Sequence, residues 1–300
     1  MRPATIGPMR YGICLPNFTD LASPDAIEAA AATAERLGWN AVWTTDHVLV
    51  DHGEAAEEYR TNYDAIETLA WVGARHPGLR LATSVIVVPQ RNAVVLAKEL
   101  STLDALSGGR LVAGVGVGWN EREFLNLAAA ERFHVRGAHL DETIGLWRHL
   151  WSGTSEPFRG RFHALEDFVF GPLPAQGASV PIIVGGRSEA ALRRAGRLGD
   201  GYHSSATRPS AYAERVPVIR AAAEAAGRPM PSLSARVRVQ FGQASDRFYA
   251  MRGSPEEVAA EVRSWAQVGV EELALWFSVD SADDLVPAVE RFAAEVVPFV

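Results

Sequence analysis

This 300-residue chain lacks several sequence features on which common protein functions depend. Cys14 is its one cysteine, which excludes an intrachain disulfide and any metal site built from several cysteines. No apolar run approaches the roughly 18 residues that a membrane-spanning helix needs. The residues before Tyr11 do not resemble a signal peptide and are predicted to form a short extension. We therefore expect a cytoplasmic protein that does not span a membrane.

An excess of positive charge is also missing, since 36 acidic residues outnumber 29 basic ones. The formal net charge is −7, and Lys98 is the only lysine. Because a nucleic-acid surface needs a basic face, we expect no nucleic-acid partner. Walker A, G-x-S-x-G and H-E-x-x-H motifs are absent, so phosphate transfer by a P-loop, the α/β-hydrolase mechanism and zincin-type hydrolysis have no support. We expect no metal ion.

The chain does contain a regular alternation of short β-branched runs and longer alanine-rich amphipathic segments. This pattern is typical of β–α units around a parallel sheet. Eight such units favour a closed (β/α)8 TIM barrel of the α/β class over an open doubly wound sheet, because closure removes both sheet edges. The predicted strands are Tyr11–Leu15, Ala41–Thr45, Arg80–Val88, Leu111–Val117, Ile182–Val184, Gly201–Ser204, Ser234–Phe241 and Glu272–Phe277.

Helix signals lie between the strands. Ser23-Pro24-Asp25 combines an N-cap residue with a first-turn proline and an acid, and Ser254 to Glu257 has the pattern of a capping box. Residues 50–60 are acidic and are predicted to form a helix-poor loop. Other helices are expected near Tyr63–Arg75, Ala93–Leu106, Gly137–Trp151, Glu189–Leu198, Pro209–Ala226 and Ala282–Val296.

The spacing of the units is uneven in one place. Residues 118–181, between the fourth and fifth predicted strands, are far more than one crossover helix needs. We predict a single domain over residues 1–300, with an insertion at about 119–180 on the catalytic face of the barrel, where βα loops grow. The insertion includes a hairpin-like segment at residues 158–162.

The Asp46-His47 pair is the first candidate for chemistry, because residues just past the C-terminal ends of barrel strands form active sites. Histidine can give or take a proton near neutral pH, and a carboxylate can orient a ligand group. Neighbouring strand residues point to opposite faces, so the two are not expected to act as one dyad unless the strand has ended. The alternative is that Asp46 caps the next segment and His47 is a core histidine.

Other strand ends carry glycines. Gly185–Ser188 stands between a strand and a helix, where backbone N–H groups, a helix N-terminus and Arg187 could hold a phosphate. The alternative is an ordinary tight turn. Gly114–Gly118 is not a dinucleotide fingerprint, because its spacing is G-x-G-x-G.

Aromatic residues also fall at strand ends. Trp119 and Trp276 are predicted to wall a pocket for a flat ligand, and Asn17 and Phe18 at the end of the first strand are assigned to the same substrate pocket.

Together, these strand-end residues resemble the luciferase-like monooxygenase superfamily, and specifically its branch that depends on the deazaflavin coenzyme F420. The resemblance covers nearly the whole chain to about Ser204 and is weaker beyond. Its most specific parts are Leu37–Trp43 leading to Asp46-His47, Ala82–Val85, Leu103–Arg110 with Gly114–Trp119, and Gly185-Gly186 through Ala195–Tyr202.

The resemblance implies an oxidoreductase that moves a hydride between F420 and a small organic substrate, and that forms a homodimer through helices beside the early strands. It implies that Asp46 bonds the pyrimidine edge of the deazaflavin and that His47 relays a proton beside the reactive ring centre. Ser84-Val85 would be a non-prolyl cis peptide that forms a bulge behind the ring. The groove for the phosphate and tail would be lined by Gly118, Gly185, Gly186 and Arg187.

One position departs from the pattern. Some sugar-phosphate-oxidising relatives place a glutamate where this chain has Trp119. A proton acceptor is therefore missing there, and no set of lysines or arginines for a substrate phosphate is evident, which favours a more apolar pocket. An FMN-dependent monooxygenase supplied with reduced flavin by a partner reductase, and a non-catalytic ligand-binding barrel, are the alternatives.

Overall fold

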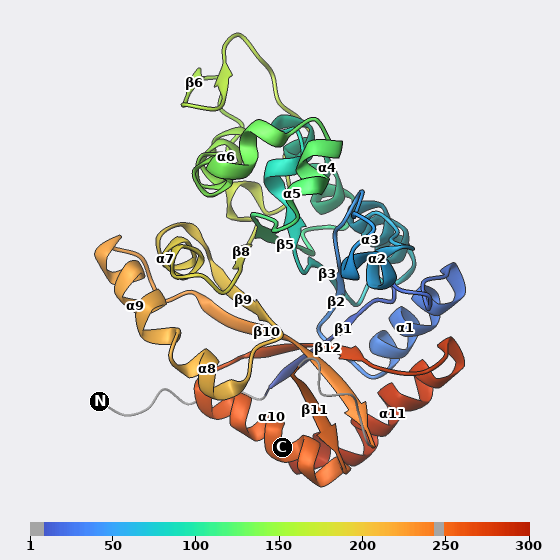
Figure 1. The fold of residues 1–300 in the computed structure, drawn as a ribbon. Helices are drawn as coiled ribbons and strands as arrows, with labels where there is room; N and C mark the ends of the chain where they lie inside the picture. Colours follow the sequence, from blue (N-terminus) through green and yellow to red (C-terminus); the bar gives the residue numbers. More distant parts are fainter. Residues whose placement is uncertain (1–8, 243–248) are drawn as a thin grey trace.

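Parallel strands close into an eight-membered barrel in the computed structural model, which describes residues 9–242 and 249–300 (Figure 1). The extension expected before Tyr11 lies mostly outside the described residues. The barrel closes where the last strand pairs with the first, with Leu273 opposite Tyr11. Its strands, in order, are β1 (Arg10–Cys14), β2 (Ala41–Thr44), β3 (Arg80–Thr83) with β4 (Ile86–Val87), β5 (Leu111–Gly116), β8 (Ile182–Gly185), β9 (Gly201–Ser205), β10 (Ser232–Phe241) and β12 (Glu272–Phe277). The predicted (β/α)8 fold is confirmed.

The third predicted strand is interrupted. A continuous strand over Arg80–Val88 was expected, but β3 ends at Thr83 and β4 begins at Ile86. The Ser84–Val85 peptide bond between them is cis, as the family resemblance implied. A 3-10 turn, Val88–Gln90, then leads into the next helix.

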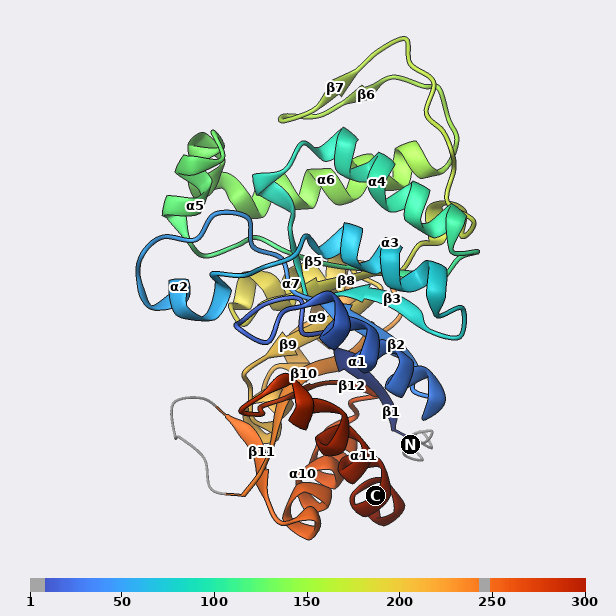
Figure 2. The same ribbon diagram turned by 90° about the vertical axis from the view of Figure 1, so that its right-hand side faces the viewer.

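Helices surround the barrel and cover its strands (Figures 1 and 2). The predicted caps are present: the Ser23 side chain accepts a hydrogen bond from the Ala26 N–H, and Ser254 and Glu257 form a capping box. Both caps satisfy N–H groups that a helix start would otherwise leave without partners. The main helices are α1 (Pro24–Arg36), α3 (Ala65–Arg75), α4 (Ala93–Leu106), α6 (Arg136–Trp151), α7 (Glu189–Leu198), α10 (Pro255–Val268) and α11 (Leu285–Glu295).

Two helix predictions are wrong in detail. The segment expected to be a helix-poor loop contains a short helix, α2 (Glu54–Tyr59). The single helix expected over Pro209–Ala226 is two helices, α8 (Pro209–Ala213) and α9 (Val216–Ala225). Pro217 explains the break, because proline lacks an N–H and is tolerated only in the first turn of a helix.

The core follows strand alternation. On β2, Val42 packs outward against the helices, while Trp43 belongs to a smaller cluster inside the barrel with Cys14, Ala82 and Val112. Gly12 on β1 allows this, since a Cβ there would lie 2.6 Å from Trp43 Nε1. Full burial of each large apolar side chain contributes about 1.5–3 kcal/mol.

The insertion has two parts, one before α6 and one after it. Its first part, including α5 (Glu121–Asn126), follows β5 and lies at the carboxyl ends of the strands. The remainder follows α6, and its hairpin of β6 (Phe158–Arg159) and β7 (Ala164–Leu165) lies along the outer side of α6 (Figure 2). Glu142 on α6 accepts N–H bonds from Arg161, Phe162 and His163. The expected placement on the catalytic face therefore holds only for the first part, because α6 carries the chain away from that face.

One strand was not predicted. β11 (Ala250–Gly253) adds to β10 in parallel, with Ala250 opposite Arg238. Within the described residues, no helix combines the length and the apolar composition that crossing a membrane requires.

Candidate active site

The strand ends surround a pocket of about 900 Å³. Three residues predicted from the sequence line it, namely Trp119, Arg187 and Trp276. Tyr59 from α2 and Arg236 from β10 also line it, although neither was predicted. The pocket therefore lies where the barrel rule placed it.

His47 lies just past β2, and its ring is held by a carboxylate. Its Nδ1 is 3.1 Å from Glu123 Oε2 on α5. The imidazole also packs against Tyr59, with ring centroids 4.3 Å apart, and meets Trp119 edge-on at 5.9 Å. Because an ionised carboxylate only accepts hydrogen bonds, Nδ1 carries the hydrogen. No residue that the structure describes hydrogen-bonds Nε2, which leaves it as the nitrogen that can exchange a proton.

Glu123 is almost fully buried, with 1% of its side chain exposed. Its Oε1 accepts the N–H groups of Val48 (2.6 Å) and Leu49 (3.1 Å), and Gln90 donates to Oε2 at 3.1 Å. Burial alone would raise the pKa of Glu123, but the hydrogen bonds from His47 and Val48, the charge of His47 and the bond from Gln90 lower that pKa to about 2. Glu123 is therefore a permanent negative charge that fixes both His47 and the loop after it.

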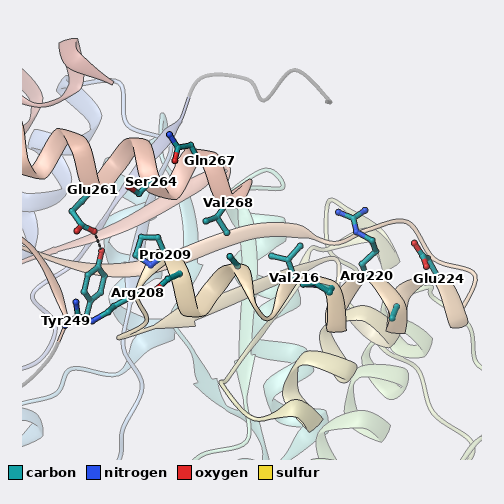
Figure 3. A pocket seen from close by; sticks show the side chains of 14 residues that line it. Arg208, Pro209, Val216, Arg220, Glu224, Tyr249, Glu261, Ser264, Gln267 and Val268 are labelled. Atoms are coloured by element: carbon teal, nitrogen blue, oxygen red, sulfur yellow. Dashed lines mark hydrogen bonds between the residues drawn. The ribbon is translucent and has the colours of Figure 1, made fainter. Parts of the chain in front are cut away.

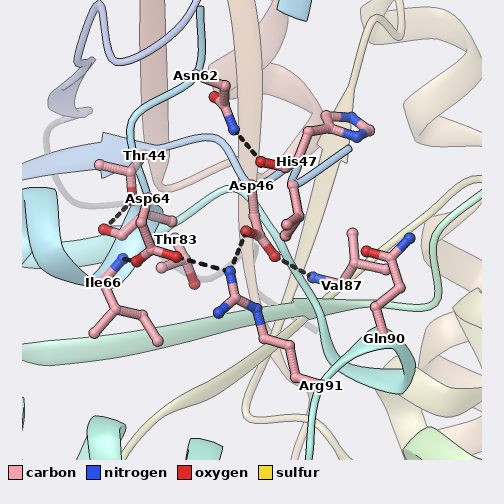
Figure 4. Close-up of polar contacts among 12 residues, drawn as sticks. Thr44, Asp46, His47, Asn62, Asp64, Ile66, Thr83, Val87, Gln90 and Arg91 are labelled. Atoms are coloured by element: carbon pink, nitrogen blue, oxygen red, sulfur yellow. Dashed lines mark hydrogen bonds and ion pairs between the residues drawn. The ribbon is translucent and has the colours of Figure 1, made fainter. Parts of the chain in front are cut away.

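Asp46 points in a different direction from His47 (Figure 4). Arg91 donates to its Oδ1 at 2.6 Å and the Val87 N–H donates to its Oδ2 at 2.9 Å. Arg91 also donates to Asp64, the N-cap of α3. Burial would lower the pKa of Arg91, but the charges and hydrogen bonds of Asp46 and Asp64 raise it. The Asp46 side chain thus fastens β2 to β4, and its predicted contact with a cofactor stays a prediction.

Three amide side chains beside this network each keep one buried polar atom without a hydrogen-bond partner: Asn62 Oδ1, Gln90 Oε1 and Asn120 Nδ2. Their other ends are engaged, since Asn62 donates to the His47 carbonyl (Figure 4), Gln90 donates to Glu123, and Asn120 caps α5. Buried polar atoms without partners are costly, so a ligand that brings donors and acceptors to them would be stabilised, although none of the three amides is among the residues that line the 900 Å³ pocket.

The Ser84 side chain points into the barrel and not toward His47. Its Oγ is 2.9 Å from His203 Nε2, and His203 Nδ1 is 2.8 Å from Ser234 Oγ. The His203 ring stacks on Trp43 at 4.6 Å. Burial, with a smaller contribution from the positive charge of Arg236, lowers the pKa of His203 to about 3. His203 is therefore a neutral structural histidine beneath the pocket.

The end of the first strand supplies a structural amide, Asn17, and an aromatic residue behind the pocket, Phe18. Asn17 is fully buried, and its amide spans backbone groups of Thr45 and Tyr63. It joins strand ends together, and its predicted place in the substrate pocket stays a prediction. The ring centroid of Phe18 lies 5.0 Å from that of Trp276 and 5.5 Å from that of Tyr59, on which Phe18 stacks. Phe18 therefore belongs to the aromatic wall behind the pocket.

The predicted glycines have a packing reason. A Cβ on Gly185 would lie 2.9 Å from Val85 Cγ1, and one on Gly118 would lie 2.6 Å from Val87 Cγ1. Gly118 and Gly186 also have positive φ values of 74° and 127°. The strand-end glycines therefore make room for the side chains around the cis peptide, and their predicted contact with a cofactor tail stays a prediction.

The amino-acid sequence of this chain is similar to that of proteins whose family is known. Residues 9–251 match the model for luciferase-like monooxygenases. An F420-dependent glucose-6-phosphate dehydrogenase of Nakamurella multipartita is 31% identical over 256 residues, which cover 83% of this chain and 73% of that protein.

Two solved structures show the same fold. An F420-dependent secondary alcohol dehydrogenase in complex with an F420–acetone adduct superposes with a TM-score of 0.82 at 18% identity, covering 98% of this chain and 99% of that one. The oxygenating part of 3,6-diketocamphane monooxygenase from Pseudomonas putida, in complex with FMN, gives 0.80 at 15% identity, with 97% and 98% covered.

Proposed function

Because the chain belongs to the luciferase-like monooxygenase family, we propose that it is an F420-dependent oxidoreductase that transfers a hydride between the deazaflavin and a small organic substrate. One observation carries the proposal: His47 packs against Tyr59 and Trp119, which line the pocket, with Nδ1 held by buried Glu123 and with Nε2 available. The F420-dependence named for the relatives supports the choice of cofactor.

The residues present fit a deazaflavin. Its polar ring edge offers both donors and acceptors, which match the unpartnered atoms Asn62 Oδ1, Gln90 Oε1 and Asn120 Nδ2. These three amides, together with the bulge at Ser84-Val85, would hold it. The bound deazaflavin supplies a ring carbon that accepts or gives a hydride.

The chain's own residues handle the proton. When a substrate alcohol is oxidised, its carbon gives up a hydride and its hydroxyl proton moves to His47 Nε2. In the reverse direction Nε2 returns a proton to the carbonyl oxygen. Glu123 holds Nδ1–H, and so keeps Nε2 as the proton acceptor and fixes the ring plane. Trp119 packs against the His47 ring, with the ring centroids 5.9 Å apart.

The cofactor is tested by adding F420 and FMN separately to the purified chain and following fluorescence quenching. We expect F420 to bind at least tenfold more tightly. A preference for FMN would overturn the proposal and favour the two-component flavin monooxygenase, a chemistry found among the proteins of the same fold.

The role of His47 is tested with the variant His47→Ala. The substrate is first chosen from a panel of small alcohols, ketones and carboxylates, as the one that bleaches or restores F420 absorbance fastest with wild type. We expect turnover to fall about 10²–10⁴-fold while F420 affinity stays within threefold. His134→Ala is the matched control, because that side chain is 81% exposed. Unchanged turnover in His47→Ala would contradict the proton-relay role and leave a ligand-binding barrel as the better description.

The proposal includes a homodimer that works in the cytoplasm. Helix α4, which packs on β5 and α3, exposes Val95 and Leu106, the latter 83% accessible. Light scattering should give a molar mass twice that of one chain. Leu106→Asp should lower the measured mass toward that of a single chain. A monomeric wild type would contradict the dimer without bearing on the redox chemistry.

A further inference from the structure

Arg236 is a buried cation in the pocket wall that has no counter-charge within the part of the chain that the structure describes. It lies on β10 and is 8% exposed. Its Nη1 donates to Thr45 Oγ1 at 2.9 Å and to the Ser84 carbonyl at 3.5 Å. Among the described residues, no carboxylate lies within ion-pair distance, and no acceptor meets its Nε or Nη2.

Another buried arginine shows the usual arrangement. Arg194 on α7 is 6% exposed and forms an ion pair with Asp141. Burial of a charge is expensive unless the charge is paired, and folded proteins therefore almost always pair it. Arg236 departs from that rule where a ligand can reach it, because it lines the 900 Å³ pocket.

The edge of the guanidinium that lacks partners is specific in shape. Nε and Nη2 present parallel N–H groups that match the two oxygens of a carboxylate, which is the bidentate geometry that arginine prefers. Thr45 and the Ser84 carbonyl fix the opposite nitrogen, so the open edge is held in one orientation.

Aromatic rings surround the same group. The guanidinium carbon lies 5.0 Å from the ring centroids of both Phe18 and Trp276. These contacts stabilise the cation in part. Tyr59 stacks on Phe18 and also packs on His47, so one aromatic wall joins the arginine to the proton-handling residue. Flat walls of this kind accept a flat apolar body.

The other charges of the pocket favour a single negative charge on the ligand. Four acids line it: Asp20, Asp51, Glu58 and Asp280. Two more arginines line it: Arg238 already faces Glu58 at 3.9 Å and lies over Trp276, and Arg187 is exposed on the loop after β8. The four acids outnumber the three arginines that line the pocket, so a phosphate dianion is less favoured there than a ligand with a single negative charge.

From this arrangement we propose that the substrate is a flat carboxylate, whose carboxylate group is bound by Arg236 and whose reacting carbon lies toward His47. The proposal rests on the redox function above and narrows its substrate class. It adds an anion-binding arginine to the expectation from sequence, which found no set of lysines or arginines for a substrate phosphate.

The test is calorimetric binding of benzoate, benzamide and inorganic phosphate to the full chain without cofactor. We expect benzoate to bind at least tenfold more tightly than the neutral benzamide and than phosphate. Arg236→Gln should weaken benzoate at least tenfold, and Arg236→Lys should recover part of the loss, since it restores charge but not the bidentate edge. Circular dichroism and the melting temperature confirm that each variant is folded.

Arg220→Gln is the matched control. Arg220 is an exposed arginine on α9 that lines a separate hollow of about 800 Å³ between α8, α9 and α10 (Figure 3). Its substitution should leave benzoate affinity within twofold, and a larger loss would place the anion in that hollow.

Three results would overturn the proposal: equal affinity for benzoate and benzamide, tighter binding of phosphate, or full benzoate affinity in Arg236→Gln. Competition between benzoate and F420 would assign Arg236 to the cofactor and would also contradict it. Because benzoate binding needs no cofactor, failure of F420 to bind would refute the redox function while leaving the carboxylate site in place.

Discussion

Asp46 and Arg236 are both buried charges at the ends of barrel strands, but only Asp46 has its counter-charge within the described chain. On the side formed by β2, β4 and α5, Arg91 pairs with Asp46, and Glu123 receives four hydrogen bonds. On the side formed by β10 and β12, Arg236 meets a hydroxyl, a carbonyl and two aromatic rings.

This difference in charge pairing indicates two roles at the pocket, namely orientation of a catalytic residue and binding of a ligand. Paired charges on the first side hold His47 in a fixed orientation, which a proton relay needs. The unpaired charge on the second side keeps its binding capacity for a ligand, at some loss of stability. Substitutions on the two sides should therefore change stability in different ways.

The largest effect is expected for Arg91→Met. It would leave Asp46, whose side chain is 1% exposed, as a buried carboxylate without its cation. Breaking a buried ion pair in this way costs about 3–5 kcal/mol. Urea denaturation at pH 7 measures the change in the free energy of unfolding. Arg36→Met is the control, because its pair with Glu290 is exposed and should contribute at most about 1 kcal/mol.

The next effect appears in acid. The pKa of Glu123 is about 2 in the folded chain, against a reference value of 4.5. Its stabilising contribution is therefore complete above pH 4.5 and is lost as the pH falls toward 2, by about 3 kcal/mol in total. Between pH 6 and pH 3, wild type should lose more stability than Glu123→Gln in urea titrations. Parallel losses in the two proteins would contradict this.

The fold was accessible from the sequence because its signals are local. The Ser23 cap, the Ser254 capping box and the β-branched runs each act within a few residues, and the structure confirms them. Pro209–Ala226 shows the limit of that approach: an alanine-rich segment favours helix throughout, while Pro217 imposes a new helix start.

The site was only partly accessible, since its polar contacts join distant segments. Asn120 followed by Glu123 has the spacing of a helix N-terminus, in which the glutamate would fold back on its own cap. In the structure Asn120 does cap α5, but Glu123 crosses to His47 instead. Nothing local distinguishes those two partners.

Arg236 did have a signal in the sequence. Ser234, Arg236 and Arg238 alternate with Ala235 and Val237 along one strand. Strands of a closed parallel barrel are normally apolar on both faces, so an alternating polar row indicates side chains directed into the barrel and its mouth. The structure places all three there, with Ser234 on His203 and both arginines in the pocket wall.

A packing change extends the comparison beyond charges. A Cβ on Gly116 would lie 2.6 Å from Val85 Cγ2, beside the cis peptide, so Gly116→Ala should destabilise by about 1–3 kcal/mol through overpacking. Gly145→Ala is the matched control on the exposed face of α6, where no atom lies within 4 Å. It should stabilise by about 0.5–1 kcal/mol. Equal effects would mean that the bulge yields easily.

The smallest effect is expected for Arg236→Met, and it tests the comparison most directly. This change removes a buried charge without stripping any carboxylate of its partner, and the methionine retains apolar contact with Phe18 and Trp276. The free energy of unfolding should stay within about 1 kcal/mol of wild type in either direction, because the relief of desolvation offsets the lost bonds to Thr45 and Ser84. A loss as large as that of Arg91→Met would show that Arg236 is a structural cation, and the two sides of the pocket would then not differ in the way that their contacts indicate.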